Sequence, residues 1–166
     1  NLLLGNERFG YYETICGGTG AGAGFQGCDA VHSHMTNTRL TDPEVLEHRY
    51  PIRLIRFEVR RGSGGSGITR GGDGVRRVLA ALSPLSGSLL AQHRVERPYG
   101  LDSGDSGCCG EARIIRHGGT TEELPGISAF ELDSGDQLWI ETPGGGGCGD
   151  AGGPVPGMDS SLGWLG

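Results

Sequence analysis

The sequence predicts a mainly β fold of the α+β type, a short-strand β assembly with short helices and glycine-rich loops. Two observations support this prediction. Glycine supplies 34 of the 166 residues without a Gly-X-Y period, so the glycines suit tight turns and close backbone contacts rather than collagen. Apolar residues recur in short runs bounded by Gly, Pro, Asp and Ser, which is typical of strands and turns. The length suits one domain with a modest core.

The first third of the chain is predicted to contain a loop, an extended segment and a helix. Residues 15–27 form the glycine-rich loop, and residues 30–36 form the extended segment. The sequence Thr41-Asp42-Pro43-Glu44 is a capping box with Thr41 as the N-cap and Pro43 in the first turn. Tyr50-Pro51 is expected to end the helix, because the residue before a proline disfavours helical backbone.

Strands are predicted next. Residues 52–61 change the parity of their apolar positions, which indicates a β-bulge near Leu54-Ile55. After a second glycine-rich connection at residues 62–74, two further strands, 75–82 and 88–95, flank a turn at Pro84-Leu85-Ser86-Gly87. These two strands are candidates for a hairpin.

The last third repeats the pattern of strand and turn. A loop at residues 97–110 precedes a predicted hairpin of residues 112–116 and 122–124 around His117-Gly118-Gly119. Two more strands flank the turn Asp133-Ser134-Gly135-Asp136, and residues 143–149 form a loop. We expect one domain over residues 1–150 and a flexible Gly/Pro/Ser tail over residues 151–166.

Charge composition excludes several functions. The formal net charge is −6, and all 14 basic residues are arginine. Without lysine the chain has no Walker A lysine, Schiff-base lysine or lysine general base. The acidic balance argues against a nucleic-acid partner, and no apolar run approaches the ~20 residues that cross a bilayer, so no membrane partner is assigned. The arginines of residues 53–61, interrupted by Glu58, are interpreted as a solvated or paired strand face.

Cysteine usage and the N-terminus suggest a cytoplasmic protein. The five cysteines form an odd set without CxxC spacing, which favours reduced thiols over a disulfide framework or a zinc ribbon; they are Cys16, Cys28, Cys108, Cys109 and Cys148. The first residues lack an initiator Met and a signal peptide, so the chain is expected to start within a longer protein.

His32 and His34 are the first candidate site residues. Two residues apart on an extended segment, both imidazoles would face one side and could share a metal or an anion. Further ligands, such as Asp29 or Glu13, would have to come from the fold, so no metal is assigned. Hydrogen bonding to a neighbouring loop or subunit is the alternative for these histidines.

Three other polar residues flank glycine or histidine. Glu13 precedes the first glycine-rich loop, where a carboxylate could act as a base or bind an amide. Asn37 and Arg39 supply donors beside the histidines, although such side chains hold turns before helices equally well. No Gly-x-Ser-x-Gly motif is present, so serine catalysis is unsupported.

Seven motifs follow one another along the chain: residues 11–18 with Tyr-Tyr-Glu-Thr and Gly-Gly, His-Ser-His-Met-Thr-Asn-Thr-Arg at 32–39, Thr-Asp-Pro-Glu through Tyr-Pro at 41–51, and residues 61–67, 70–74, 97–101 and 141–150. In this order they resemble the C-terminal part of the hydantoinase B/5-oxoprolinase family over residues 10–149. The amino-acid sequence of residues 32–39 is most similar to that of ATP-dependent 5-oxoprolinases.

The resemblance implies ATP-dependent hydrolysis of the lactam 5-oxo-L-proline to L-glutamate. ATP would phosphorylate the amide oxygen, which makes the ring carbon electrophilic enough for water. The resemblance implies that ATP and Mg²⁺ bind outside this chain, in a hydantoinase A-like portion of the same chain or of a partner subunit. A homo-oligomeric, cytoplasmic enzyme of glutathione metabolism is expected, and this chain would be inactive alone.

The resemblance also implies which residues line the substrate site, without assigning their individual roles: Glu13, His32, His34, Asn37 and Arg39. Departures from the family pattern at Cys16, Cys148 and Ala151 weaken the choice of substrate. A hydantoinase or ketone carboxylase subunit segment therefore stays an alternative. So does a non-catalytic segment that scaffolds subunit association.

Overall fold

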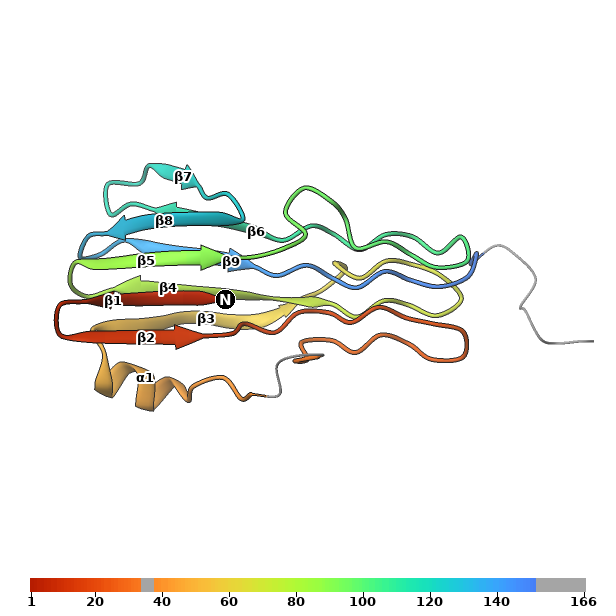
Figure 1. Cartoon of the computed structure of the whole chain (residues 1–166), viewed down its shortest axis with the longest axis horizontal. Helices are drawn as coiled ribbons and strands as arrows, with labels where there is room; N and C mark the ends of the chain where they lie inside the picture. The colour runs from red at the N-terminus through yellow and green to blue at the C-terminus, as the bar shows by residue number, and fades with distance from the viewer. Residues whose placement is uncertain (34–37, 152–166) are drawn as a thin grey trace, which may run out of the picture.

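The protein is seen in a computed structural model that describes residues 1–33 and 38–151, and it consists of two stacked antiparallel β-sheets (Figure 1). The four-stranded sheet has the order β2-β1-β5-β8, with bounds β1 Leu2–Asn6, β2 Phe9–Glu13, β5 Leu85–Leu90 and β8 Ile127–Leu132. The five-stranded sheet has the order β3-β4-β9-β6-β7, with bounds β3 Ile52–Arg60, β4 Gly74–Ala81, β9 Gln137–Glu141, β6 Glu111–Ile115 and β7 Thr121–Glu123.

Apolar side chains from both sheets fill the space between them. Fully buried members include Leu2 and Leu85 from the first sheet and Leu79 and Ile114 from the second. Helix α1, Pro43–Arg49, lies beside β2 and β3 (Figure 1) and inserts Leu46 into this core. The helix thereby covers one side of the sandwich, where both sheets have an edge strand. Among the described residues no helix is long and apolar enough to cross a membrane.

The predicted fold class is confirmed, and so are several elements. The pairing of β3 with β4 shifts register between Leu54 and Arg56, where the bulge was expected. β6 pairs with β7 as the predicted hairpin. The helix ends at Tyr50 as expected, but its N-cap is Asp42 rather than Thr41. The Asp42 carboxylate accepts hydrogen bonds from the backbone N–H groups of Glu44 and Val45, which a residue one position earlier cannot reach as well.

The predicted hairpin of residues 75–82 and 88–95 is wrong. β4 pairs with β3 and β9, whereas β5 pairs with β1 and β8 in the other sheet. The link at residues 82–84 therefore crosses between the layers. Gly87, expected in the turn, lies within β5, where an added Cβ would meet the Phe130 ring at 2.3 Å. Residues 2–13, for which no strand was predicted, form the β1-β2 hairpin.

Beyond one end of the sandwich, four glycine-rich segments run side by side (Figure 1). We call them the glycine bundle: residues 17–30, 61–73, 97–110 and 142–149. The segment 142–149 bonds to all three others through its backbone. Gly18 N–H donates to the Pro143 carbonyl at 3.1 Å, Gly65 N–H to Gly145 at 2.8 Å and Leu101 N–H to Gly147 at 2.9 Å. The connections predicted as loops thus form an ordered, hydrogen-bonded assembly.

Glycine is required in this assembly because the backbones approach too closely for side chains. A Cβ at Gly145 would lie 1.9 Å from the Thr19 carbonyl oxygen, and one at Gly146 would lie 1.8 Å from that of Tyr99. Real Cβ atoms essentially never come within 3.0 Å of another heavy atom. The predicted extended segment 30–36 lies partly outside the described residues, and the predicted tail does so apart from Ala151.

We predict that Gly145→Ala destabilises the chain strongly, because its methyl group must displace backbone on a neighbouring segment. Overpacking of this kind costs about 1–3 kcal/mol and sometimes more. Urea unfolding of the chain would measure the change. Gly118→Ala is the matched control, since a Cβ there meets nothing within 4 Å. Equal stability of the two variants would contradict close packing in the glycine bundle.

Candidate functional site

Glu13 lies at the end of β2 and faces the core, where it forms an ion pair with Arg77 of β4. The Arg77 Nε and Glu13 Oε2 atoms are 2.8 Å apart, and Arg77 Nη2 donates to Glu13 Oε1 at 2.9 Å. The side chains are 1% and 3% exposed. The Tyr11 hydroxyl also donates to Glu13 Oε1, at 2.8 Å, and burial raises the pKa of Tyr11 to about 12, so this donor keeps its proton.

The other expected site residues lie in or beside the part of the chain outside the described residues. His34 and Asn37 fall within residues 34–37, so their position and the face shared by the two histidines stay predictions. His32 is half-buried, and its Nε2 atom is buried without a hydrogen-bond partner. Arg39 is exposed. No hydrogen bond or ion pair joins Glu13, His32 and Arg39 in the described structure.

An aspartate-arginine cluster joins two segments of the glycine bundle, 17–30 and 61–73, just before His32. Asp29 Oδ1 accepts from the Asp73 N–H at 2.7 Å and from Arg70 Nη2 at 2.8 Å. Arg70 Nη1 lies 3.1 Å from Asp73 Oδ2, and Asp73 Oδ1 accepts from the Gly64 N–H at 2.7 Å. The Asp73 backbone hydrogen bond and the Arg70 guanidinium lower the pKa of Asp29 despite its partial burial. The motifs at residues 61–67 and 70–74 therefore hold Asp29, three residues before His32.

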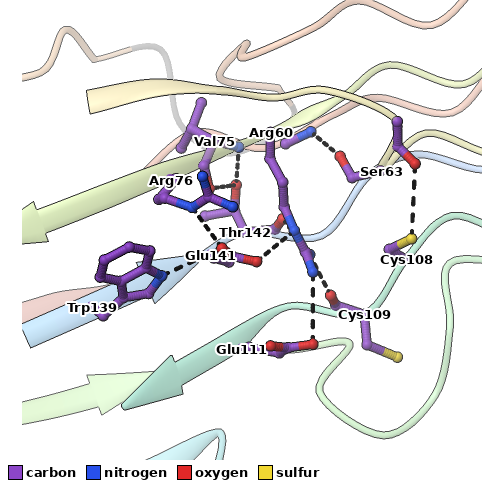
Figure 2. Close-up of polar contacts among 12 residues, drawn as sticks. Arg60, Ser63, Val75, Arg76, Cys108, Cys109, Glu111, Trp139, Glu141 and Thr142 are labelled. Atoms are coloured by element: carbon purple, nitrogen blue, oxygen red, sulfur yellow. Dashed lines mark hydrogen bonds and ion pairs between the residues drawn. The ribbon is translucent and has the colours of Figure 1, made fainter. Parts of the chain in front are cut away.

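A second charged cluster joins the five-stranded sheet to the glycine bundle (Figure 2). Glu141, at the end of β9, lies 2.7 Å from Arg60 Nε and 2.6 Å from Arg76 Nε, and it accepts a 3.3 Å hydrogen bond from the Trp139 indole. Arg60 Nη1 also donates to the carbonyl oxygen of Cys109, at 2.6 Å. One guanidinium thus connects the sheet to a bundle segment.

The environment of Glu141 keeps its carboxylate ionised. Burial alone raises the pKa of this carboxyl group, but the hydrogen bond from Arg76 and the charge of Arg60 outweigh burial and hold the pKa below its usual value. Next to it, Thr142 Oγ1 accepts from the Val75 N–H at 2.7 Å (Figure 2). The Glu-Thr-Pro motif at residues 141–143 therefore fixes the start of segment 142–149 of the glycine bundle.

A cleft with two adjoining hollows lies where the sandwich meets the glycine bundle. Both hollows are lined by Ser33, His93 and Pro143. The first, of about 320 Å³, continues along the glycine bundle past Gly18 and Gly144. The second, of about 350 Å³, continues toward the end of β5 and Arg94. Cavities of this size suit small molecules. Ser33, from the segment of the predicted histidines, therefore lines the cleft together with His93, for which no role was predicted.

His93 holds an unusual conformation at the point that the two hollows share. Its φ is +54°, a region that non-glycine residues rarely adopt and that is concentrated at functional sites. Its Nδ1 lies 3.0 Å from the Glu96 carbonyl oxygen, so in the neutral ring Nδ1 carries the proton and Nε2 is the acceptor. Sequence reasoning missed His93, because it stands in a stretch predicted as strand and no motif marks a positive φ.

The described residues contain no group of three His, Cys, Asp or Glu side chains that could hold a metal ion. The cleft can bind a small polar ligand through backbone, imidazole and guanidinium groups. The side chains that could take part in such binding include the imidazole of His93 and the guanidinium of Arg94.

Comparison with known sequences identifies the family. The Hydantoinase B/oxoprolinase family description matches residues 1–151. The chain belongs to this family. Relatives include 5-oxoprolinase 1 of Arabidopsis thaliana, 46% identical over 90% of this chain, and the 5-oxoprolinase of Saccharomyces cerevisiae, 48% identical over 86%. The chain spans only 12% of the length of each.

Solved structures share the fold of this hydantoinase B/oxoprolinase chain. The ATP-dependent caprolactamase of Pseudomonas jessenii superposes with a TM-score of 0.70 at 24% identity, covering 90% of this chain and 28% of that one. An acetone carboxylase superposes with a TM-score of 0.66 at 15% identity, covering 81% and 22%. The family resemblance inferred from the motifs is confirmed. The roles expected of Glu13, His32, His34, Asn37 and Arg39 stay predictions.

We predict that Arg77→Ala destabilises the chain by about 3–5 kcal/mol, because it leaves the Glu13 carboxylate buried and unpaired. Urea unfolding at neutral pH would measure the loss. Arg53→Ala is the matched control, since Arg53 is exposed on β3, and a change within about 0.5 kcal/mol is expected for it. A loss for Arg77→Ala as small as the control's would show that the buried pair does not stabilise the sandwich.

We predict that Glu141→Gln weakens the dependence of stability on pH in acid. Because the folded-state pKa of Glu141 is below its value of 4.5 in the unfolded chain, its ionised form stabilises the fold above pH 4.5. This contribution is lost as the pH falls through the lower folded-state pKa. Urea unfolding at several pH values from 6 to about 3 would therefore give a shallower slope for the variant. Glu96→Gln, an exposed site, should keep the original slope.

Proposed function

We propose that this chain is the C-terminal part of an ATP-dependent cyclic amide hydrolase of the 5-oxoprolinase type, which hydrolyses 5-oxo-L-proline to L-glutamate. One observation carries the proposal: identity of 46–48% to proteins named 5-oxoprolinase extends over nearly the whole chain. The complete enzyme would act in the cytoplasm as a homo-oligomer, within glutathione metabolism.

The nucleotide is proposed to bind outside this chain, as the family resemblance implies. The chain has no lysine for a Walker A site, and the described residues contain no group of three His, Cys, Asp or Glu side chains that could hold a metal ion. We therefore assign ATP and Mg²⁺ to a hydantoinase A-like portion of the same polypeptide or of a partner subunit. This chain would instead contribute one wall of the lactam site, and it would be inactive alone.

The proposed wall is the cleft between the sandwich and the glycine bundle. His32, His34, Asn37 and Arg39 would line the site from the segment that enters the cleft at Ser33. Glu13 would act through its partners, because its carboxylate is occupied by Arg77 and Tyr11 and cannot reach a ligand without breaking a buried pair. His93 Nε2 would accept a proton within the cleft.

A scaffolding segment is the second candidate, and a specific observation favours it. The charged residues of the motifs are used in internal contacts: Glu13 with Arg77, Asp73 with Arg70 and Glu141 with Arg60. A segment with its polar groups so occupied would support neighbouring subunits without touching the substrate. A hydantoinase activity is supported less, by 34% identity to one component of a putative D-/L-hydantoinase of Pseudomonas.

A chimera would test the proposal. Residues 1–151 would replace the matching 12% of the yeast 5-oxoprolinase, and ATP hydrolysis dependent on 5-oxo-L-proline would be measured. We predict an active chimera, because this chain then supplies its wall of the site. His34→Ala in the chimera should abolish most of this hydrolysis without changing the oligomeric state.

Two outcomes would contradict the proposal. A chimera that assembles correctly and binds ATP but does not respond to 5-oxo-L-proline would exclude this substrate; hydantoin and ketones would then be screened as substrates. A His34→Ala chimera that keeps its activity, or that loses activity only by disassembling, would favour scaffolding over a catalytic site. Size-exclusion chromatography with light scattering separates disassembly from loss of chemistry.

A further inference from the structure

Arg94 is a half-buried arginine without an ionic partner. Its Nε and Nη1 atoms are buried, and neither has a hydrogen-bond partner. The carboxylate that most influences its charge is Glu111, but Glu111 lies 3.6 Å from Arg60 and 4.0 Å from Arg113 instead. No carboxylate of the described residues forms a salt bridge with Arg94. Its charge is therefore uncompensated within the described structure.

Leaving this guanidinium unpaired is energetically unfavourable. Buried N–H groups without acceptors keep their full desolvation cost, and a buried charge costs more. Burial accordingly lowers the pKa of Arg94. The guanidinium fork pairs best with a carboxylate through two parallel hydrogen bonds. Because Nε and Nη1 of Arg94 are buried, Nη2 is the nitrogen left to donate a charge-assisted hydrogen bond to an anion in the hollow that Arg94 lines.

The hollow beside Arg94 has the lining that a small cyclic acid requires. It measures about 350 Å³, and apolar residues line it together with Arg94, namely Ile15, Leu89, Leu90 and Ile140. The methylene groups of a small ring fit apolar lining, and a single cation at the wall fits a single carboxylate.

We propose that this hollow is a carboxylate subsite, in which Arg94 binds the carboxylate of a small lactam acid and so selects it over neutral lactams. This inference rests on the proposed function, because 5-oxo-L-proline is a lactam that carries a carboxylate. The lactam ring would lie against the apolar lining, and its amide would point toward His93, where the two hollows meet. Arg94 is then a specificity-determining residue.

The active chimera tests this subsite with two lactams that share a ring. 2-Pyrrolidone has the ring of 5-oxo-L-proline without its carboxylate. Arg94→Ala should raise KM for 5-oxo-L-proline about 10- to 100-fold, the effect of one charge-assisted hydrogen-bonded contact, and leave kcat/KM for 2-pyrrolidone nearly unchanged. Arg94→Lys should recover part of the loss. Arg53→Ala is the matched control, because Arg53 is exposed and is not among the residues that line the cleft.

A structural role for Arg94 would give a different result. If Arg94 pairs with a carboxylate side chain from another part of the enzyme, Arg94→Ala lowers stability or activity toward both lactams equally. That outcome would overturn the proposal. An unchanged KM for 5-oxo-L-proline would overturn it as well.

A binding measurement on the chain itself separates failure of the subsite from failure of the proposed function. The Arg94 Nε–H resonance would be followed by NMR during titration with 5-oxo-L-proline and, separately, with 2-pyrrolidone. A shift with the acid alone supports the subsite even if the chimera proves inactive. A shift with neither lactam, or with both, overturns it, whatever reaction the complete enzyme performs.

Discussion

Contact between backbones, with no side chains between them, is the constraint on which the rest of this structure depends. Four segments of the glycine bundle approach one another more closely than any Cβ permits, and the segment 142–149 bonds to the other three. Backbone hydrogen bonds replace the hydrophobic contacts that hold ordinary loops. The cleft exists because these segments leave the sandwich in fixed directions. A rigid wall of this kind can position ligand-binding groups that stand at its base.

Arginine attaches this bundle to the sandwich. A bundle made of backbone has few side chains with which to anchor its ends, so residues of the neighbouring strands do so. Arg60 of β3 reaches the Glu141 carboxylate and the Cys109 carbonyl with different atoms of one guanidinium. Within the bundle, Arg70 joins Asp29 to Asp73 in the same way. The planar fork of arginine suits such double contacts better than the single charge of lysine. The all-arginine composition is consistent with this use.

Local signals in the sequence predicted local structure correctly. The parity change in β3, the end of α1 before Pro51 and the turn between β6 and β7 each depend on neighbouring residues. The sequence did not predict which strands pair. β4 and β5 are joined by a short link, which suggested a hairpin, yet they belong to different sheets. The site was predictable only through family motifs. The positive φ of His93 and the unpaired state of Arg94 depend on distant segments, which composition and spacing do not reveal.

The order of the segments along the chain has a consequence for folding. The central segment of the glycine bundle, 142–149, is the last of the four to be synthesised, and its partner at residues 17–22 lies more than a hundred positions earlier. Contacts of such large sequence separation close slowly. During translation the backbone groups of the first three segments that bond to residues 142–149 stay unpaired until that segment has been synthesised. Chaperone binding or hydrogen exchange during translation would concentrate there, and the cleft would be among the last features to form.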